Sequence, residues 1–351
     1  MSKFLCPLAL IYSILCEANR KFSRPKKFSK PVISVGNITW GGTGKTPVVI
    51  ELLNLLVKNN LKPMVLTRGY RRRNKASVML KDGAVGIRAT DSGDEPLLIA
   101  ESVPQACVIV GADRYNNALK YEREINPDVY VLDDGFQHWN IQRDLDIVCI
   151  NAANPFGNGM LIPAGILREK PKALKRAGLV IITNSDMVSY EELKRLEKTL
   201  FVLSGQISVI THYGGFEYKT TDLAADFNLE LLRKSDVYSL SAIGFAKGFE
   251  NSIRKSGIEI KDSIVLRDHS VYNNNMLEKI MNQKGKNSCF IVTAKDAVKF
   301  QNISLDIKER IAVLVVKLQF KTGKEQWERK LLKCLPSFWT ETERSSLTEI
   351  I

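Results

Sequence analysis

The sequence predicts an α/β protein with a doubly wound, mostly parallel sheet and a second, smaller α/β domain. Short apolar runs rich in Val and Ile alternate with amphipathic segments through the first 205 residues, at 32–35, 64–67, 107–110, 129–132, 147–150 and 179–183. Such alternation indicates βαβ units and a parallel sheet. Beyond residue 205 the spacing changes, and new strands are expected at 237–242, 263–266, 290–293 and 311–320. Residues 207–213 and 216–219 are expected to pair as an antiparallel ribbon around Gly214 and Gly215.

Size and composition limit the number of domains and the kinds of binding partner. The chain has 351 residues, 44% of them hydrophobic, which suggests two domains with packed cores. Its net charge of +13 favours anionic partners: a nucleotide, a nucleic acid or an acidic membrane surface. Six scattered cysteines form no close pair, so neither a zinc site nor a disulfide framework is indicated, and a reducing cytosol is expected.

The N-terminus is an apolar run followed by basic residues. Residues 4–16 are almost wholly apolar with helical spacing, and six Lys or Arg follow between residues 20 and 30. A signal peptide would place its charge first, and the run is too short to span a bilayer. The segment fits a helix in a membrane interface with its basic tail on anionic headgroups. A helix packed on the domain, with a solvated linker, is the alternative.

A glycine-rich loop after the first strand carries the strongest motif. The loop leads into a helix at 46–58, and this strand–loop–helix order is typical of a phosphate-binding loop. Residues expected to bind nucleotide are Thr39, Trp40, Gly41, Gly42, Thr43, Gly44, Lys45 and Thr46. Lys45 would reach the β- and γ-phosphates and Thr46 would hold Mg²⁺. The usual first glycine is Thr39 here, and an ordinary glycine-rich turn is the alternative.

Carboxylates follow two later segments. Asp133 and Asp134 end the strand at 129–132, where a P-loop protein presents its second acidic motif to Mg²⁺. An Asp-Gly turn in a hairpin would explain them too. Asp94 stands in an acidic loop before a helix, either as a carboxylate near the phosphates or as the helix N-cap.

Two further loops are candidates for substrate contacts. The basic run after the second strand, including Arg68, Tyr70 and Arg71, lies at the expected ligand-binding edge, although a solvated loop explains it equally well. The Gly/Pro loop at 155–169 ends in Arg168 and Glu169, and loops of that length are usually functional.

Collinear motifs over nearly the whole chain resemble the tetraacyldisaccharide 4′-kinase (lipid A 4′-kinase) family. These are Val35-Gly-Asn-Ile-Thr-Trp-Gly-Gly-Thr-Gly-Lys-Thr-Pro, Thr67-Arg-Gly-Tyr, Gly93-Asp-Glu-Pro-Leu-Leu, Gly111-Ala-Asp-Arg, Leu132-Asp-Asp-Gly-Phe-Gln-His, Pro163-Ala-Gly-Ile-Leu-Arg-Glu, Asp268-His and Thr293-Ala-Lys-Asp. The family's loop also has Thr at the position of Thr39. Two positions depart from its pattern: Ala246, where Pro is usual, and Ala294, where Glu is usual.

The resemblance implies ATP- and Mg²⁺-dependent phosphorylation of the 4′-hydroxyl of an acylated glucosamine disaccharide 1-phosphate. It implies work at the cytoplasmic face of an inner membrane. Asp94 would take the proton from the sugar hydroxyl with His269 as its partner, so the two domains would have to close. Thr46, Asp133, Asp134 and Glu169 would serve the metal. Substrate contacts are expected from Arg68, Tyr70, Arg71, Arg114 and His138.

The expected organisation is a membrane-interface helix and tail at 1–30, a P-loop domain at 31–205 and a C-terminal domain at 206–351. A nucleic-acid-dependent ATPase is disfavoured because the basic residues lack interleaved aromatics, so no nucleic-acid partner is expected. A GTP-type switch has only the faint motif at Thr183 in its favour, and a P-loop kinase for a small soluble substrate is a further alternative.

Overall fold

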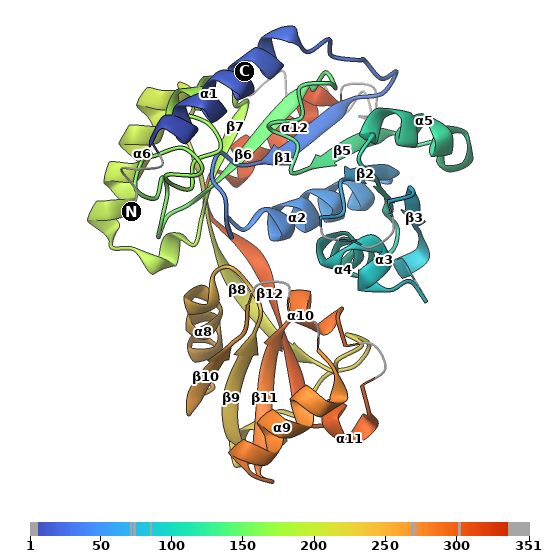
Figure 1. The fold of residues 1–351 in the computed structure, drawn as a ribbon, viewed down its shortest axis with the longest axis vertical. Coiled ribbons are helices and arrows are strands. Elements are labelled where there is room, and N and C mark those ends of the chain that lie inside the picture. The colour runs from blue at the N-terminus through green and yellow to red at the C-terminus, as the bar shows by residue number, and fades with distance from the viewer. Residues whose placement is uncertain are drawn as a thin grey trace.

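The computed structural model describes residues 6–70, 72, 75–84, 86–267, 270, 272–300 and 303–335. Figure 1 shows two lobes joined by a long two-stranded ribbon. One sheet of twelve strands runs through both, in the order β10-β9-β11-β12-β8-β7-β6-β1-β5-β2-β4-β3. The predicted fold class, a mostly parallel α/β sheet of the P-loop type, is confirmed.

The first lobe has a parallel sheet with one antiparallel edge strand. Its strands are β1 (Val32–Gly36), β2 (Pro63–Thr67), β3 (Val78–Leu80), β4 (Cys107–Val110), β5 (Val129–Asp133), β6 (Leu145–Asn151) and β7 (Leu179–Thr183). All residues of β1, β2 and β5 are buried because helices cover both sheet faces, which is why these runs are continuously apolar. Val35 pairs with Asp133 across β1 and β5, so the glycine-rich loop and the acidic pair leave the sheet at one edge.

Helices of the first lobe surround this sheet. They are α1 (Cys6–Phe22), α2 (Lys45–Lys58), α3 (Ala89–Ser92), α4 (Asp94–Ser102), α5 (Arg114–Ile125) and α6 (Tyr190–Ser204), with short 3-10 turns η2 (Asp82–Ala84), η3 (Pro171–Arg176) and η4 (Ser185–Met187). Ser189 and Glu192 start α6 with a complete capping box. Among the described residues, no helix is both long and apolar enough to cross a membrane.

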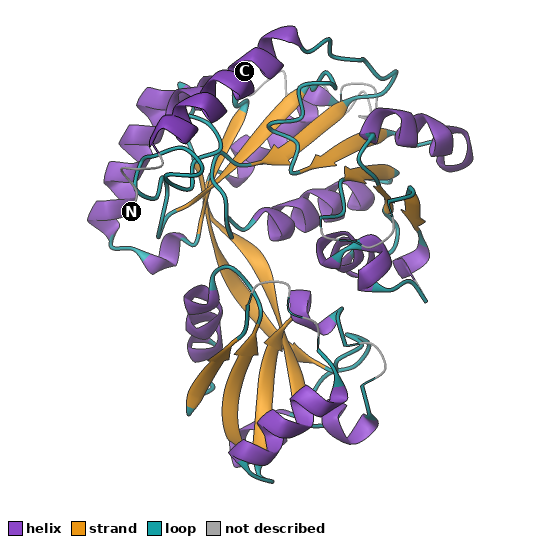
Figure 2. Cartoon of the chain, viewed as in Figure 1, coloured by secondary structure: helices purple, strands orange, loops and turns teal. Residues whose placement is uncertain are grey.

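The ribbon between the lobes consists of β8 (Val209–Lys219) and β12 (Ile311–Thr322), paired antiparallel (Figure 2). The expected hairpin around Gly214 and Gly215 is wrong, because β8 runs straight through both glycines. Its partner is β12, about a hundred positions away in sequence: Tyr213 pairs with Leu318 and Glu217 with Val315. The pairing register shifts at two points along β12, so the ribbon is not a regular ladder.

The second lobe lies at the far end of this ribbon. Its strands are β9 (Asp236–Ser241), β10 (Asp262–Val265) and β11 (Ser288–Thr293), and its helices are α7 (Leu229–Lys234), α8 (Ala246–Lys255), α9 (Asn274–Lys284), α10 (Ala294–Ala297) and α11 (Leu305–Lys308). The strands β9, β10 and β11 are mutually parallel, as βαβ connections require.

The chain then returns to the first lobe. After β12 it forms α12 (Lys324–Cys334), whose Trp327 is 1% exposed and belongs, with Leu331 and Leu335, to the first lobe's core. The expected boundary near residue 205 stays a prediction, but α12 and Leu335 pack on the first lobe, at the end of the ribbon opposite to β9–β11.

Candidate active site

The glycine-rich loop is held in shape by three buried contacts. Asn37 Nδ2 donates to Thr43 Oγ1 at 2.8 Å, and Thr183 Oγ1 donates to the Thr43 carbonyl at 2.9 Å. Asn151 Nδ2 donates to the Gly42 carbonyl at 3.1 Å. Gly44 is the N-cap of α2 with φ +75°, a left-handed conformation that favours glycine. The loop's backbone therefore stands preformed at the helix N-terminus, as anion binding requires.

The start of the loop is tied to the Gly/Pro segment at 155–169. Thr39, 3% exposed, forms an antiparallel bridge with Leu167, and the Trp40 N–H donates to the Ile166 carbonyl at 2.6 Å. Trp40 itself is exposed. This contact brings Arg168 and Glu169 beside the nucleotide loop although they are far from it in sequence.

Lys45 and Asp134 form the charged centre of the site. Lys45 Nζ lies 3.3 Å from Asp134 Oδ1, and Arg168 Nη1 lies 2.8 Å from Asp134 Oδ2. Arg114, a buried side chain, donates to the Asp134 carbonyl at 3.3 Å. Burial alone would raise the pKa of Asp134, but Lys45, Arg168 and Arg114 outweigh it and hold that pKa well below its usual range. Asp134 is therefore ionised at every physiological pH.

Asp133 has the opposite electrostatic environment. It is buried at the end of β5, where Oδ2 accepts a hydrogen bond from Thr67 Oγ1 at 2.9 Å. Burial, together with the neighbouring charges of Glu95 and Asp134, raises the pKa of Asp133 to about 6. A carboxylate desolvated in this way gains stabilisation from a cation, which suits a metal ligand.

Glu169 already has a basic partner. Arg176 Nη2 lies 2.9 Å from Glu169 Oε2, and Gln137 Nε2 donates to Glu169 Oε1 at 2.9 Å. No group of three acidic, His or Cys side chains among the described residues forms a ready-made metal cage. Mg²⁺ usually takes one or two carboxylates and completes its shell with water and substrate phosphates. Thr46, Asp133 and Asp134 therefore fit a Mg²⁺ ion that arrives with a nucleotide, and the assignment of Glu169 stays a prediction.

Asp94 is the first residue of α4 and contacts the second lobe. Its Oδ2 lies 3.6 Å from Lys299 Nζ, and the next residue, Glu95, accepts a hydrogen bond from Lys295 Nζ at 2.9 Å. Burial would raise the pKa of Glu95, but Lys295 and Lys45 outweigh it and lower that pKa. The N-cap of α4 is Gly93, so Asp94 is not the cap.

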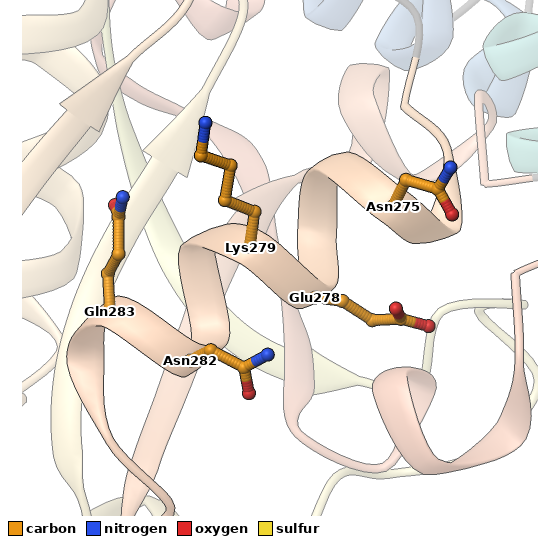
Figure 3. Close-up of a pocket in the computed structure, with 5 residues that line it drawn as sticks. All are labelled: Asn275, Glu278, Lys279, Asn282 and Gln283. Carbon is orange, nitrogen blue, oxygen red and sulfur yellow. The ribbon is translucent and has the colours of Figure 1, made fainter.

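A cavity of about 730 Å³ lies between the lobes, and residues of both lobes line it. The glycine-rich loop from Gly41 to Pro47 forms one wall, and Glu95, Leu98 and Glu101 of α4 form another. Further lining comes from α2, from the ribbon, and from the second lobe, including Ile243, Phe245 and Lys295. A second hollow of about 510 Å³ follows the outer face of α9. Figure 3 shows that its polar side chains all come from that single helix, so no groups converge there from different elements.

The expected substrate residues lie around the same edge. Arg68 and Tyr70 are exposed at the end of β2, whereas Arg114 is buried. Burial and the charges of Arg114 and Arg143 lower the pKa of His138 to about 4, so its imidazole is neutral at physiological pH. Arg71 and His269 lie outside the described residues.

Helix α1 comes within range of the charges of Arg168 and Glu169. Burial and a hydrogen bond to Cys16 raise the pKa of Tyr12, which also feels the charges of Arg168 and Glu169. The other side of α1 is apolar and open to solvent, with Leu8, Leu10, Ile11, Ile14, Leu15 and Phe22 all more than half exposed. The described residues therefore leave an apolar face largely uncovered on the helix that comes near these charges.

Several residues around the site were not predicted from sequence. Lys299, Tyr213 and Phe245 come from the ribbon or the second lobe, and only their position in three dimensions brings them to the cavity or to Asp94. Lys295 lies inside the Thr293-Ala-Lys-Asp motif, but nothing in the sequence pairs it with Glu95.

The comparisons agree with this geometry. A family model described as tetraacyldisaccharide-1-P 4′-kinase matches residues 1–336. A tetraacyldisaccharide 4′-kinase from Pelobacter propionicus is 32% identical over 323 residues, covering 90% of this chain and 87% of its own. One from Halothermothrix orenii is 34% identical over 308 residues, covering 84% and 79%.

A solved structure has the same fold over nearly the full length. It is LpxK from Aquifex aeolicus in complex with ATP, with a TM-score of 0.73, 26% identity, and coverage of 95% of this chain and 99% of that one. The family resemblance inferred from the motifs is thus confirmed. The chain belongs to the tetraacyldisaccharide 4′-kinase family, whose members are phosphotransferases with an alcohol group as acceptor.

Proposed function

We propose that this chain transfers the γ-phosphate of ATP to the 4′-hydroxyl of a tetraacyldisaccharide 1-phosphate, with Asp94 as the general base. One observation carries the proposal: the glycine-rich loop and Glu95, which is next to Asp94, line one cavity between the lobes, and Asp133 lies close enough to feel the charges of Glu95 and Lys45. Phosphoryl transfer needs in-line positioning and neutralised charge more than covalent help from the protein.

Each group then has a role that its environment supports. Lys45 and the loop amides hold the β- and γ-phosphates, and Lys45 exchanges its contact with Asp134 for the nucleotide. Thr46, Asp133 and Asp134 would hold Mg²⁺, which when bound would offset the negative charge of the phosphates. Arg168, 2.8 Å from Asp134, is placed to stabilise charge on the transferred group.

The acceptor hydroxyl is a weak nucleophile, so a base within hydrogen-bond reach must take its proton. Asp94 is the first residue of α4, and 15% of its side chain is exposed. His269 remains the proposed partner of Asp94. Glu169, Arg68, Tyr70, Arg71, Arg114 and His138 remain proposed contacts to the metal or the lipid headgroup.

We further propose that the chain works at the cytoplasmic face of an inner membrane. The exposed apolar face of α1 and the basic residues that follow it suit an interface of anionic lipid. Because Tyr12 of α1 lies within range of the charges of Arg168 and Glu169, a lipid held at this helix would have its headgroup near the phosphates.

The test is transfer of the γ-phosphate of ATP to an acylated disaccharide 1-phosphate by the wild type and by Asp94→Asn. General base catalysis contributes roughly 10²- to 10⁴-fold, and we expect a loss of that size with ATP binding retained. Asp91→Asn is the matched control, because the Asp91 carboxylate pairs with Arg88 at the surface, 3.3 Å away, and such a pair contributes little. A folded, ATP-binding Asp94→Asn enzyme with near-normal turnover would refute the assignment of the base. Wild-type enzyme that leaves this acceptor unphosphorylated would refute the substrate.

A further inference from the structure

Two consecutive carboxylates of the first lobe meet two lysines of the second. Asp94 and Glu95 open α4, and Lys295 and Lys299 lie four positions apart in and just after α10. Lys295 Nζ is 2.9 Å from Glu95 Oε1, and Lys299 Nζ is 3.6 Å from Asp94 Oδ2. A spacing of four brings side chains to the same side of a helical turn. The two pairs therefore form side by side where the lobes touch.

Lys299 differs sharply from Lys295 in burial. The Lys299 side chain is 4% exposed, against 20% for Lys295. A buried ammonium group is costly unless it is paired, and Lys299 meets that requirement through Asp296 Oδ1 at 2.9 Å. Its Nζ also lies 5.7 Å from the centre of the Tyr272 ring, within range of a cation–π contact.

Asp296 is itself fixed by the second lobe. Its side chain is fully buried, and Oδ2 accepts hydrogen bonds from Thr293 Oγ1 at 2.8 Å and from the Ala242 N–H at 3.2 Å. These hydrogen bonds fix the Asp296 carboxylate, and the carboxylate in turn fixes the Lys299 ammonium group. The Lys299 side chain is therefore fixed by burial and by Asp296, with its Nζ near Asp94. It lacks the conformational freedom of a surface lysine.

We propose that Lys299 is a positioning residue for the phosphoryl transfer, which holds the Asp94 carboxylate in its ionised, substrate-ready form when the lobes are docked. The inference rests on the proposed role of Asp94 as the base. At 3.6 Å the contact is longer than a hydrogen bond, so Lys299 acts on Asp94 by charge.

Other charges near Asp94 make this contribution necessary. Among the described residues, Asp296 and Tyr272 face the pair from the second lobe, and Glu95 adjoins it on α4 with Lys45 and Lys295 close by. Removing the Lys299 ammonium would leave Asp94 and Asp296 as neighbouring carboxylates without the cation that now lies between them. In such a pair the protonated form of one member is favoured.

The experiment measures kcat for phosphate transfer against pH in Lys299→Met and Lys299→Arg. A base that must be ionised gives a limb on which kcat falls as pH falls. We expect Lys299→Met to move this limb upward by about 1–3 pH units, because an opposite charge nearby shifts a carboxyl pKa by that amount. At a pH on the limb, each unit of upward shift lowers kcat by up to about tenfold, while KM for ATP changes less. Lys299→Arg keeps the charge and should keep the wild-type limb.

Lys295→Met is the matched control, because it breaks the neighbouring pair at the same contact between the lobes. Lys295 lines the nucleotide cavity, so we expect a higher KM for ATP with the limb in its wild-type place. If Lys299→Met lowers kcat equally at every pH, with an unmoved limb, the residue is only structural and the proposal is wrong.

Two further variants separate other causes of failure. Asp296→Asn combined with Lys299→Gln removes both buried charges, so it is the variant to use where Lys299→Met fails to fold. It takes the ammonium from Asp94 without leaving a second carboxylate beside it, so we expect a smaller upward move of the limb, and an unmoved limb would contradict the proposal. The Asp94→Asn enzyme separates the two proposals: if it is inactive while the Lys299→Met limb is unmoved, only the role of Lys299 fails. If Asp94→Asn stays active, the base assignment and the role of Lys299 fail together.

Discussion

The open face of α1 offers the sharpest test of how this kinase reaches its lipid. Leu10, Ile14 and Leu15 are 61%, 59% and 63% exposed, and they belong to a helix whose opposite side packs near Arg168. We predict that replacing these three residues with Ser abolishes most vesicle binding while the fold persists. A water-exposed side chain contributes little to the free energy of folding. Its burial in a lipid interface contributes much more to the free energy of membrane binding.

The magnitude follows from the exposed fractions. Full burial of a Leu or Ile side chain is worth about 1.5–3 kcal/mol, and roughly three-fifths of each side chain is available for burial in lipid. Three such residues therefore contribute about 3–5 kcal/mol. Since 1.4 kcal/mol corresponds to a factor of ten, the partition coefficient should fall roughly 10²- to 10³-fold.

The assay is co-sedimentation with vesicles of phosphatidylethanolamine and phosphatidylglycerol, with circular dichroism to check the fold. The matched control is Val265→Ser with Leu305→Ser, which removes side chains that are 55% and 72% exposed on the second lobe. This control should bind vesicles like the wild type. Equal loss of binding in both variants, or none in the α1 variant, would show that α1 is not the membrane contact.

Two other perturbations probe the nucleotide cavity. Gly44→Ala should lower the free energy of unfolding by about 1–2 kcal/mol, because φ is +75°, and should weaken ATP binding, because its Cβ would lie 2.3 Å from Tyr213 Oη. Adding Tyr213→Phe should restore part of the ATP affinity measured by calorimetry, and no restoration would contradict the steric cause. Burial raises the pKa of Glu101 to about 7, so the folded state binds more protons than the unfolded state between about pH 4.5 and 7, and stability falls as pH rises through that window. Glu101→Gln should therefore be more stable than wild type at pH 8 by about 1–2 kcal/mol, allowing for partial exposure, but not at pH 4. Urea unfolding measures this difference in the free energy of unfolding, and an equal difference at both pH values would contradict the prediction.

Local patterns in the sequence were enough for the first lobe. The run before Gly36 is apolar at every position but one because β1 is covered on both faces, and the loop after it needs glycine for its backbone shape. Asp133 could be assigned to the same edge because parallel strands present their carboxyl ends together.

Contacts between distant segments could not be predicted in this way. The hairpin expected around Gly214 and Gly215 is wrong because a glycine pair signals a turn only where no other strand competes, and β12 does compete. The Lys299–Asp94 contact joins residues about two hundred positions apart, and an amphipathic pattern does not say which surface a helix will meet. The resemblance supplied Asp94 as a candidate, but only the docked lobes show what surrounds it.

The return of α12 to the first lobe bears on how the protein is made. Trp327, Leu331 and Leu335 fill the same core as Val35 and Val48, so residues from both ends of the described chain complete one interior. Domains made on the ribosome usually fold from the N-terminus onward. In this chain the nucleotide lobe cannot complete its core until α12 has been synthesised, whereas the second lobe, with its ends joined by β8 and β12, emerges whole before α12. We therefore expect that chains terminated after β12 have a nucleotide lobe with an incomplete, exposed core. Such chains should be bound by chaperones and degraded by proteases.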